Sequence, residues 1–221
     1  MDGVLIDSHP VHCQAWRQFL ATLGKHVSDH ELQFILEGRR REDILRHFLG
    51  ELPEEVLAEY GKQKDQLYQQ NFKYVRLMPG VRTFVKSLHR TGVRLAIATS
   101  ASTYRTGRTL EYLGLATKFT AVITGDDVSN GKPDPAVYRL ASQRMNIPPE
   151  NLLVLEDAPS GVRSAKSAGM KCIGVSSNGV SRALIQAGAD DIIPDFLELS
   201  IDKLKALWQA ITETNGACAS A

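Results

Sequence analysis

The sequence predicts an α/β fold: a doubly wound, Rossmann-like parallel sheet with a helical domain inserted near its start. The first observation is an alternation, from about residue 79 onward, of short apolar runs with stretches of helical spacing that often end at a glycine. Such runs are typical of parallel strands buried on both faces. The second observation is that residues 9–75 carry almost no strand signal and repeat apolar residues at helical intervals. Together these patterns predict a sheet domain with a helical cap.

The predicted elements of the sheet domain follow one another in regular order. A first helix at 81–88 follows Pro79 and Gly80. Strands are expected at 93–98, 121–124, 152–156, 171–175 and 191–193, with helices at 105–113, 135–145, 160–168 and 181–187. About four further helices are expected between residues 9 and 75. The expected domains are a core of residues 1–8 and 76–221 and a cap of residues 9–75 that closes over a site.

The composition excludes several classes of protein. Lys and Arg number 26 against 25 Asp and Glu, so the chain has no basic excess with which to hold a nucleic acid. Cys13, Cys172 and Cys218 show neither metal-ligand spacing nor a disulfide framework, which favours a reduced, cytoplasmic setting. No apolar run approaches the ~18 residues that span a bilayer. We therefore expect a monomer or weak dimer without nucleic-acid or membrane partners.

Polar side chains gather where the predicted strands end. In an open parallel sheet, ligands bind beyond the carboxyl ends of the strands. Hydroxyls, one lysine and several carboxylates follow these strands or stand at the start of the sequence: Thr99, Ser100, Lys132, Glu156, Asp157 and Asp2. Carboxylate oxygens suit Mg²⁺, whereas an ammonium group and hydroxyls suit phosphate oxygens. The set predicts a small phosphorylated substrate bound together with a divalent cation.

Four segments carry a resemblance to a known family: DGVLIDS at 2–8, TS at 99–100, GKPDP at 131–135 and LEDAPSG at 155–161. In order and spacing they resemble the four motifs of the haloacid dehalogenase-like superfamily. Within it, the sequence is most similar to the β-phosphoglucomutase-like and sugar-phosphate phosphatase branch with a helical cap. The resemblance implies a Mg²⁺-dependent phosphatase of small phosphorylated metabolites, with sugar phosphates as expected substrates and β-phosphoglucomutase as the alternative.

The resemblance also implies a role for each motif residue in a two-step transfer through an aspartyl-phosphate. Asp2 corresponds to the second aspartate of the first motif, which protonates the leaving oxygen and then deprotonates water. Lys132 neutralises the nucleophile and the phosphoryl oxygens. The implied phosphate ligands are Thr99 or Ser100 with Lys132, and the implied Mg²⁺ ligands are Glu156 and Asp157.

The first motif departs from the family pattern Asp-x-Asp-Gly. With Asp2 as its second aspartate, the nucleophile and its apolar strand would precede Met1. One explanation is a true start upstream of Met1, which we favour because the remaining motifs keep the polar groups that the chemistry needs. The other is a truncated, inactive chain that still binds phosphate without turning it over.

Two cap segments resemble those of β-phosphoglucomutases. Arg41 lies in GRRRED at 38–43, similar to a mutase segment whose arginine meets the non-transferring phosphate of a bisphosphorylated sugar; the alternative is a solvated, basic helix start. His12 and Trp16 stand in a mutase-like His-x-x-Ala-Trp arrangement that implies a substrate contact by His12, although a histidine near a hinge is often structural. The Lys-Asn pair that a mutase carries after Ser102 is missing, which favours the phosphatase.

Overall fold

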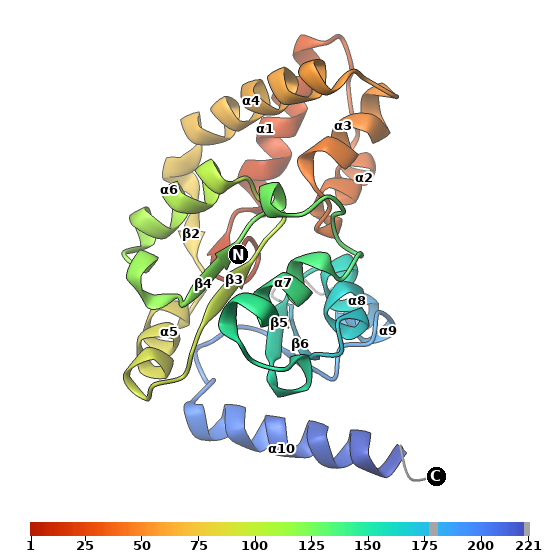
Figure 1. Ribbon diagram of the computed structural model, residues 1–221. Coiled ribbons are helices and arrows are strands. Elements are labelled where there is room, and N and C mark those ends of the chain that lie inside the picture. Colours follow the sequence, from red (N-terminus) through yellow and green to blue (C-terminus); the bar gives the residue numbers. More distant parts are fainter. Residues whose placement is uncertain (177–180, 219–221) are drawn as a thin grey trace.

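The molecule consists of a helical unit above and an α/β unit below (Figure 1). The computed structural model describes residues 1–176 and 181–218, with side chains as far as residue 213. The helical unit contains α1 (His9–Thr22), α2 (Asp29–Leu32), η1 (Gln33–Glu37), α3 (Arg41–Leu49), α4 (Glu54–Gln70) and η2 (Phe72–Tyr74), where η marks a 3₁₀ helix.

The helical unit has a hydrophobic core of its own. Its helices turn their apolar stripes toward one another, and α1 packs along α4. Ser28 starts α2 through a capping box with Glu31. The side chains at the centre of the unit are fully buried: Trp16, Phe19, Leu20, Leu45 and Leu57. This cluster is distinct from the two around the strands, whereas Val11, Ala15 and Tyr68 of the same helices pack into one of those two.

The α/β unit contains parallel strands in two groups. β3 (Ala96–Ala98) pairs with β4 (Ala121–Ile123), and β6 (Lys171–Val175) lies between β5 (Leu153–Glu156) and β7 (Asp191–Ile193). The helices of this unit are α5 (Val81–Arg90), α6 (Thr103–Leu113), η3 (Ala116–Lys118), η4 (Gly125–Asp127), α7 (Ala136–Met145), η5 (Pro149–Asn151), α8 (Pro159–Ser167), α9 (Ser181–Gln186) and α10 (Ile201–Cys218). Parallel strands that alternate with helices confirm the predicted α/β class.

Three features differ from the elements expected from the sequence. β3 begins at Ala96 rather than at 93, because its ladder to β4 starts there and Val93 lies outside it, 44% exposed. α10 follows the last predicted strand, where no helix was expected. A two-residue antiparallel ladder joins β1 (Ile6–Asp7) to β2 (Arg76–Leu77). This ladder ties together the two segments by which the chain enters and leaves the helical unit.

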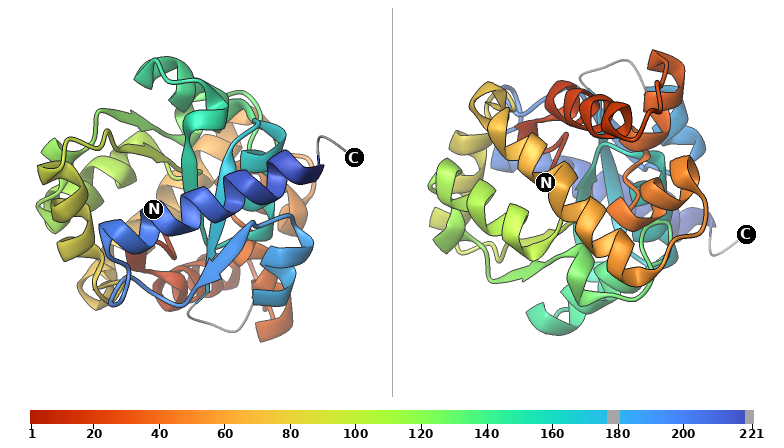
Figure 2. Two further views of the ribbon diagram at one scale, coloured as in Figure 1. Left: turned by 90° about the horizontal axis from the view of Figure 1, so that it is seen from below. Right: turned by 90° about the horizontal axis from the view of Figure 1, so that it is seen from above.

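An apolar trench separates the two groups of strands. In the part of the chain that the structure describes, β3 and β5 do not pair with each other. The trench has a volume of about 570 Å³ and is lined by β3, β5, α5 and α10, with Ile97, Leu155, Phe84 and Trp208 among its walls. α10 lies across the strands on the side seen from below (Figure 2). Because strand edges present unpaired backbone groups, one more extended strand could pair with β3 and β5 in this trench.

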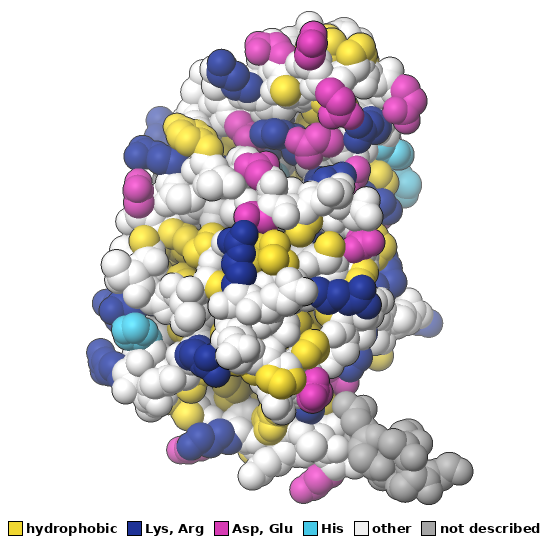
Figure 3. All heavy atoms as spheres, viewed as in Figure 1, with side chains coloured by type: hydrophobic (Ala, Val, Ile, Leu, Met, Phe, Trp, Pro, Cys, Tyr) yellow, Lys and Arg dark blue, Asp and Glu magenta, His cyan; other side chains and the backbone are white. Residues whose placement is uncertain are grey.

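Positive and negative charges are mixed on the surface. On the face shown in Figure 3, Lys and Arg side chains are interspersed with Asp and Glu side chains over both units. Neither sign dominates this face. Among the described helices, none combines the length and the apolarity needed to cross a membrane.

Candidate active site

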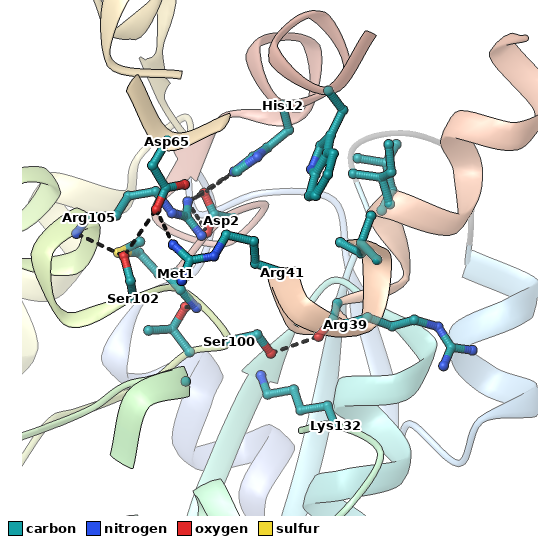
Figure 4. A pocket seen from close by; sticks show the side chains of 18 of the residues that line it. Met1, Asp2, His12, Arg39, Arg41, Asp65, Ser100, Ser102, Arg105 and Lys132 are labelled. Atoms are coloured by element: carbon teal, nitrogen blue, oxygen red, sulfur yellow. Dashed lines mark hydrogen bonds and ion pairs between the residues drawn. The ribbon is translucent and has the colours of Figure 1, made fainter. Parts of the chain in front are cut away.

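A cavity of about 100 Å³ lies between the helical unit and the carboxyl ends of the strands. Every site residue predicted from the sequence lines it: Asp2, His12, Arg41, Thr99, Ser100, Lys132, Glu156 and Asp157. Figure 4 shows His12 and Arg41 approaching from the helices above, and Ser100 and Lys132 from the loops below. The structure thus brings together side chains that are far apart in the sequence.

A tight turn presents Asp2 to this cavity. Gly3 adopts φ +62°, a left-handed conformation that glycine reaches without strain. A Cβ atom at this position would collide with the carboxylate of Asp157. Asp2 also forms a β-bridge to Ile6, whose side chain is fully buried. The Asp-Gly step therefore lets the backbone approach the end of β5 closely.

The ammonium group of Lys132 lies in a buried, hydrogen-bonded cluster. Its Nζ atom is 2.5 Å from Oε1 of Glu156 and 3.1 Å from the Tyr138 hydroxyl. Glu156 also accepts hydrogen bonds from the backbone amides of Asp157 and Ala158. Burial alone would raise the pKa of Glu156, but Lys132 and these hydrogen bonds lower it to about 2. Glu156 is thus an ionised side chain that holds Lys132 in place.

Asp157 is the carboxylate best placed to bind a metal ion. Its Oδ2 atom is 3.0 Å from Nε2 of His9. Burial raises the pKa of the Asp157 carboxyl group. Burial alone would lower the pKa of His9, but the hydrogen bond to Asp157 raises it. Glu156, the other predicted ligand, already accepts from Lys132 and two amides. The described residues contain no cluster of three or more His, Cys, Asp or Glu side chains able to hold a metal. Mg²⁺ takes one or two carboxylates and keeps several waters, so Asp157 could serve as one of its ligands.

The Asp2 carboxylate is held by groups from both units. Nη1 of Arg105, on α6, is 2.9 Å from both Asp2 oxygens. The Ser8 hydroxyl donates to Oδ1 at 2.6 Å, and Nε2 of His12 lies 3.3 Å from the same oxygen. Burial alone would raise the pKa of Asp2, but Arg105 and His12 hold it well below its usual range. Asp2 is therefore a carboxylate at neutral pH.

The protonation of His12 follows from its neighbours. Its Nδ1 atom faces the ammonium group of Lys64 at 3.2 Å, and its Nε2 atom lies 3.0 Å from Nη1 of Arg105 and 3.3 Å from Oδ1 of Asp2. Both cations can only donate hydrogen bonds, so each of them disfavours a second proton on the ring. Burial, together with Lys64 and Arg105, lowers the pKa of His12 to about 3, so the ring is neutral. Burial also lowers the pKa of Lys64 to about 8.

The two hydroxyls after β3 are bonded differently. The Ser100 hydroxyl donates to the backbone carbonyl of Gly38 at 2.8 Å and so joins the core to the helical unit (Figure 4). Thr99 is buried, and its Oγ1 atom accepts from the backbone amide of Ala101 at 3.2 Å. That bond uses a lone pair of Thr99 and leaves the hydroxyl hydrogen for another acceptor. In this conformation Thr99 is the better donor to a ligand in the cavity.

Arg41 is paired inside the helical unit. Its Nη1 atom is 2.6 Å from Oδ2 of Asp65, and its Nη2 atom is 2.9 Å from Oε1 of Glu42. Gly61 leaves room for the guanidinium group, which a Cβ atom there would overlap. Figure 4 shows the side chain of Arg41 reaching toward Asp65. A substrate phosphate at Arg41 would therefore compete with two carboxylates.

Sequence reasoning did not single out five residues that shape this site: His9, Lys64, Asp65, Arg105 and Tyr138. For one of them, Lys64, the sequence does contain an indication of a buried role. Lys64 lies on the buried stripe of α4 between Leu57 and Tyr68, where a lysine is unusual unless it has a partner. Arg105 gave no such signal, because it stands in a polar stretch of α6 that looks solvent-exposed in the sequence.

Fold and cavity together define the class of protein, a capped α/β protein with a polar site at its strand ends. Residues 1–175 match the family model described as haloacid dehalogenase-like hydrolase. The chain belongs to this family, which confirms the resemblance inferred from its four motifs.

Individual relatives cover nearly the whole chain. It is 35% identical over 208 residues to the phosphorylated carbohydrates phosphatase of Thermotoga maritima, a match to 86% of this chain and 89% of that protein. CbbY from Rhodobacter sphaeroides, solved in complex with phosphate, is similar with a TM-score of 0.82 and 28% identity over 93% of this chain and 96% of that one. A second CbbY structure, in complex with xylulose-(1,5)bisphosphate, is similar with a TM-score of 0.80 and 28% identity over 90% of this chain and 93% of that one. The similarity thus includes the helical cap.

Glu156→Gln should destabilise the protein by about 3–5 kcal/mol at neutral pH, because it leaves the buried Lys132 charge without its counter-ion. Folding lowers the pKa of Glu156 to about 2, so its stabilising contribution is full above the pKa of the unfolded chain. That contribution is lost as the pH falls toward the folded value, so the difference between wild type and variant should shrink between about pH 6 and about pH 3.

Urea unfolding at both pH values measures this difference. The exposed Glu59→Gln is the matched control and should change stability by no more than about 0.5 kcal/mol at either pH. A loss in Glu156→Gln that does not change with pH would contradict the assignment of an ionised, buried Glu156.

Gly3→Ala should cost more stability than Gly114→Ala. Both glycines have similar positive φ angles, +62° and +64°, so each substitution introduces about 1 kcal/mol of backbone strain. A Cβ atom meets open space at Gly114 but the Asp157 carboxylate at Gly3, which should add about 1–3 kcal/mol. Urea unfolding of the two variants measures the difference, and equal losses would show that Asp157 does not constrain the turn.

Proposed function

We propose that the protein is a phosphoric monoester hydrolase, a Mg²⁺-dependent phosphatase of small phosphorylated metabolites such as sugar phosphates. The observation that carries this proposal is the meeting of Lys132, Thr99 and the ionised Asp2 in one cavity beneath a helical cap. A cation and a hydroxyl suit phosphate oxygens, and the carboxylate beside them suits proton transfer. The name of the Thermotoga maritima relative and the phosphate bound to CbbY support this substrate class.

The nucleophile, in this proposal, is an aspartate at the end of a strand that fills the trench between β3 and β5. Both strands run toward the cavity, since Thr99 follows β3, Asp157 follows β5 and both residues line it. A strand between them and parallel to both would also end there. Met1 lines the cavity and the trench, so the junction of the two lies beside it. A carboxylate at this junction would attack phosphorus next to Lys132 and form an aspartyl-phosphate.

Asp2 serves as the acid–base group. With its pKa held low, it is ready to accept a proton from the water that attacks the aspartyl-phosphate. An incoming phosphate ester brings negative charge close to Asp2, which favours the protonated form that the leaving oxygen requires. Arg105 and His12 fix the direction in which the Asp2 oxygens point. The same three groups thus set both the charge and the orientation of the acid–base residue.

Asp157 and Glu156 would hold Mg²⁺ together with the nucleophilic aspartate, a set of hard oxygen donors that this ion prefers. Bound there, the ion would offset negative charge on the transferring phosphoryl group. In this proposal the strand in the trench therefore supplies the nucleophile and, with the same carboxylate, a further ligand for the metal ion.

Residues 9–75 act as a cap on a core of residues 1–8 and 76–221, and close over the substrate to exclude water. Hydrogen bonds between cap and core loops hold the closed form: Ser100 to the Gly38 carbonyl, Ser160 to the Glu37 carbonyl and Arg40 to the Val128 carbonyl. Water can replace such bonds at low net cost when the cap opens. The β1–β2 ladder lies where the hinge of this movement is expected.

An extended apolar segment ending in Phe-Asp, fused directly before Met1, should produce turnover. We expect Mg²⁺-dependent release of inorganic phosphate from esters of a broad panel, at least about 10³-fold faster than with Asn in place of the added Asp. Both fusions should raise the free energy of unfolding by on the order of 3 kcal/mol, because they cover the apolar walls of the trench. A phosphate-release assay and urea unfolding measure the two effects.

The unextended chain and the Asn fusion are the controls for this experiment. If the Asp fusion gains stability but hydrolyses no ester of the panel, the phosphatase proposal is wrong. Isomerisation of β-glucose 1-phosphate with little release of phosphate would instead show a mutase. Removal of Mg²⁺ with a chelator should abolish the turnover.

A further inference from the structure

The cap side of the cavity carries charges that cancel one another. Four charged side chains line it from α3 and α4: Arg41, Glu42, Lys64 and Asp65. They are two cations and two carboxylates, so their formal charges balance. Because each cation has a carboxylate within the same unit, no net positive charge faces a ligand from this side.

Asp65 is at the centre of this balance. Its Oδ2 atom is 2.6 Å from Nη1 of Arg41, and its Oδ1 atom is 3.5 Å from Nζ of Lys64. Its side chain is only 13% exposed, so water and salt screen these pairs weakly. Burial would raise the pKa of Asp65, but Lys64, Arg105 and Arg41 lower it. Asp65 is therefore ionised and neutralises both cations of the cap wall.

The other arginines near the cavity are also paired. Arg105 binds both oxygens of Asp2. Arg39 is 2.9 Å from Glu37, and Figure 4 shows its side chain extending away from Asp65 and Arg41. Neither guanidinium group therefore adds an unpaired charge to the cap side.

We propose that the cavity takes esters with a single phosphate and an uncharged, hydroxyl-bearing body, and that Asp65 is the residue that excludes a second phosphate. This inference rests on the proposed function, in which the transferring phosphate meets Lys132 and a metal ion on the core side. A second phosphate against the cap would meet the carboxylates of Asp65 and Glu42 without a surplus cation. The hydroxyl groups of a polyol can instead donate to those carboxylates.

The fold itself does not impose this selectivity. The CbbY structure that is similar over 90% of this chain holds xylulose-(1,5)bisphosphate. Selectivity must therefore come from side chains on the cavity wall. Asp65→Asn keeps the size of the side chain and one oxygen acceptor but removes the negative charge, which leaves Arg41 and Lys64 without their shared partner.

Calorimetric titration of the chain at neutral pH tests the proposal with three probes: inorganic phosphate, glucitol 6-phosphate and fructose 1,6-bisphosphate. In the unchanged protein the monophosphate should bind at least about tenfold more tightly than the bisphosphate. In Asp65→Asn the bisphosphate should gain about tenfold or more, since Lys64 loses its carboxylate and Arg41 keeps only Glu42, while inorganic phosphate and the monophosphate change by less than about threefold.

Two further variants keep the test decisive. Glu59→Gln makes the same change of charge on an exposed site of α4 and should leave all three affinities unchanged. Glu42→Gln removes only one of the carboxylates on Arg41 and should give a smaller gain for the bisphosphate. If thermal melting shows that Asp65→Asn is unfolded, the ranking in the unchanged protein and the gain in Glu42→Gln decide the matter.

The outcomes separate this inference from the proposed function. If inorganic phosphate binds but the bisphosphate binds as tightly as the monophosphate in the unchanged protein, the single-phosphate proposal alone is overturned. If Asp65→Asn folds and shows no selective gain for the bisphosphate, Asp65 is not the excluding residue. If none of the three probes binds, the phosphate site and the inference built on it both fail.

Discussion

The ion pair between Asp2 and Arg105 is the interaction on which the rest of the site depends. It joins the turn at the start of the chain to α6, and through His12 and Lys64 it extends to both long helices of the cap. A carboxylate in this partly buried place needs such partners, because desolvation without them would neutralise it. Charge, orientation and the contact between core and cap are therefore properties of one network.

The trench between β3 and β5 is the second constraint, and it acts on the core rather than the cap. Two strand edges and the apolar faces of α5 and α10 line it, and among the described residues no strand pairs with these two edges. Burial of apolar area and pairing of strand edges both favour filling such a space. β3 and β5 both run toward the cavity. A parallel strand in the trench between them would therefore end with its last residue in the site. Stability of the sheet and completion of the chemistry thus depend on the same segment.

The sequence was sufficient to predict the α/β class, the helical insertion and the side chains at the strand ends, because these follow from periodicity and from motifs of fixed spacing. It did not predict Arg105, Asp65 or α10. The partners of a buried charge are chosen by tertiary contacts between helices distant in sequence, so in the sequence Arg105 and Asp65 resemble ordinary polar positions of amphipathic helices. Lys64 was not predicted either, although a lysine on an apolar stripe is a signal that it has a buried partner. Glu156 was predicted as a metal ligand, and only the structure shows how firmly Lys132 engages it.

A buried ion pair on the core side and a partly buried one on the cap side both line the cavity, and their different surroundings give them different effects on a bound ester. Lys132 and Glu156 on the core side stand next to Asp157, so a divalent cation held there would add charge that a phosphate dianion can neutralise. Arg41 and Asp65 on the cap side form an ion pair of similar length, but the neighbouring carboxylate, Glu42, is already bonded to Arg41. Nothing in that wall gathers an excess of positive charge. A cavity with one side able to accept an anion and the other side neutral orients an ester in a single direction, with its phosphate toward the strand ends and its hydroxyl groups toward the cap.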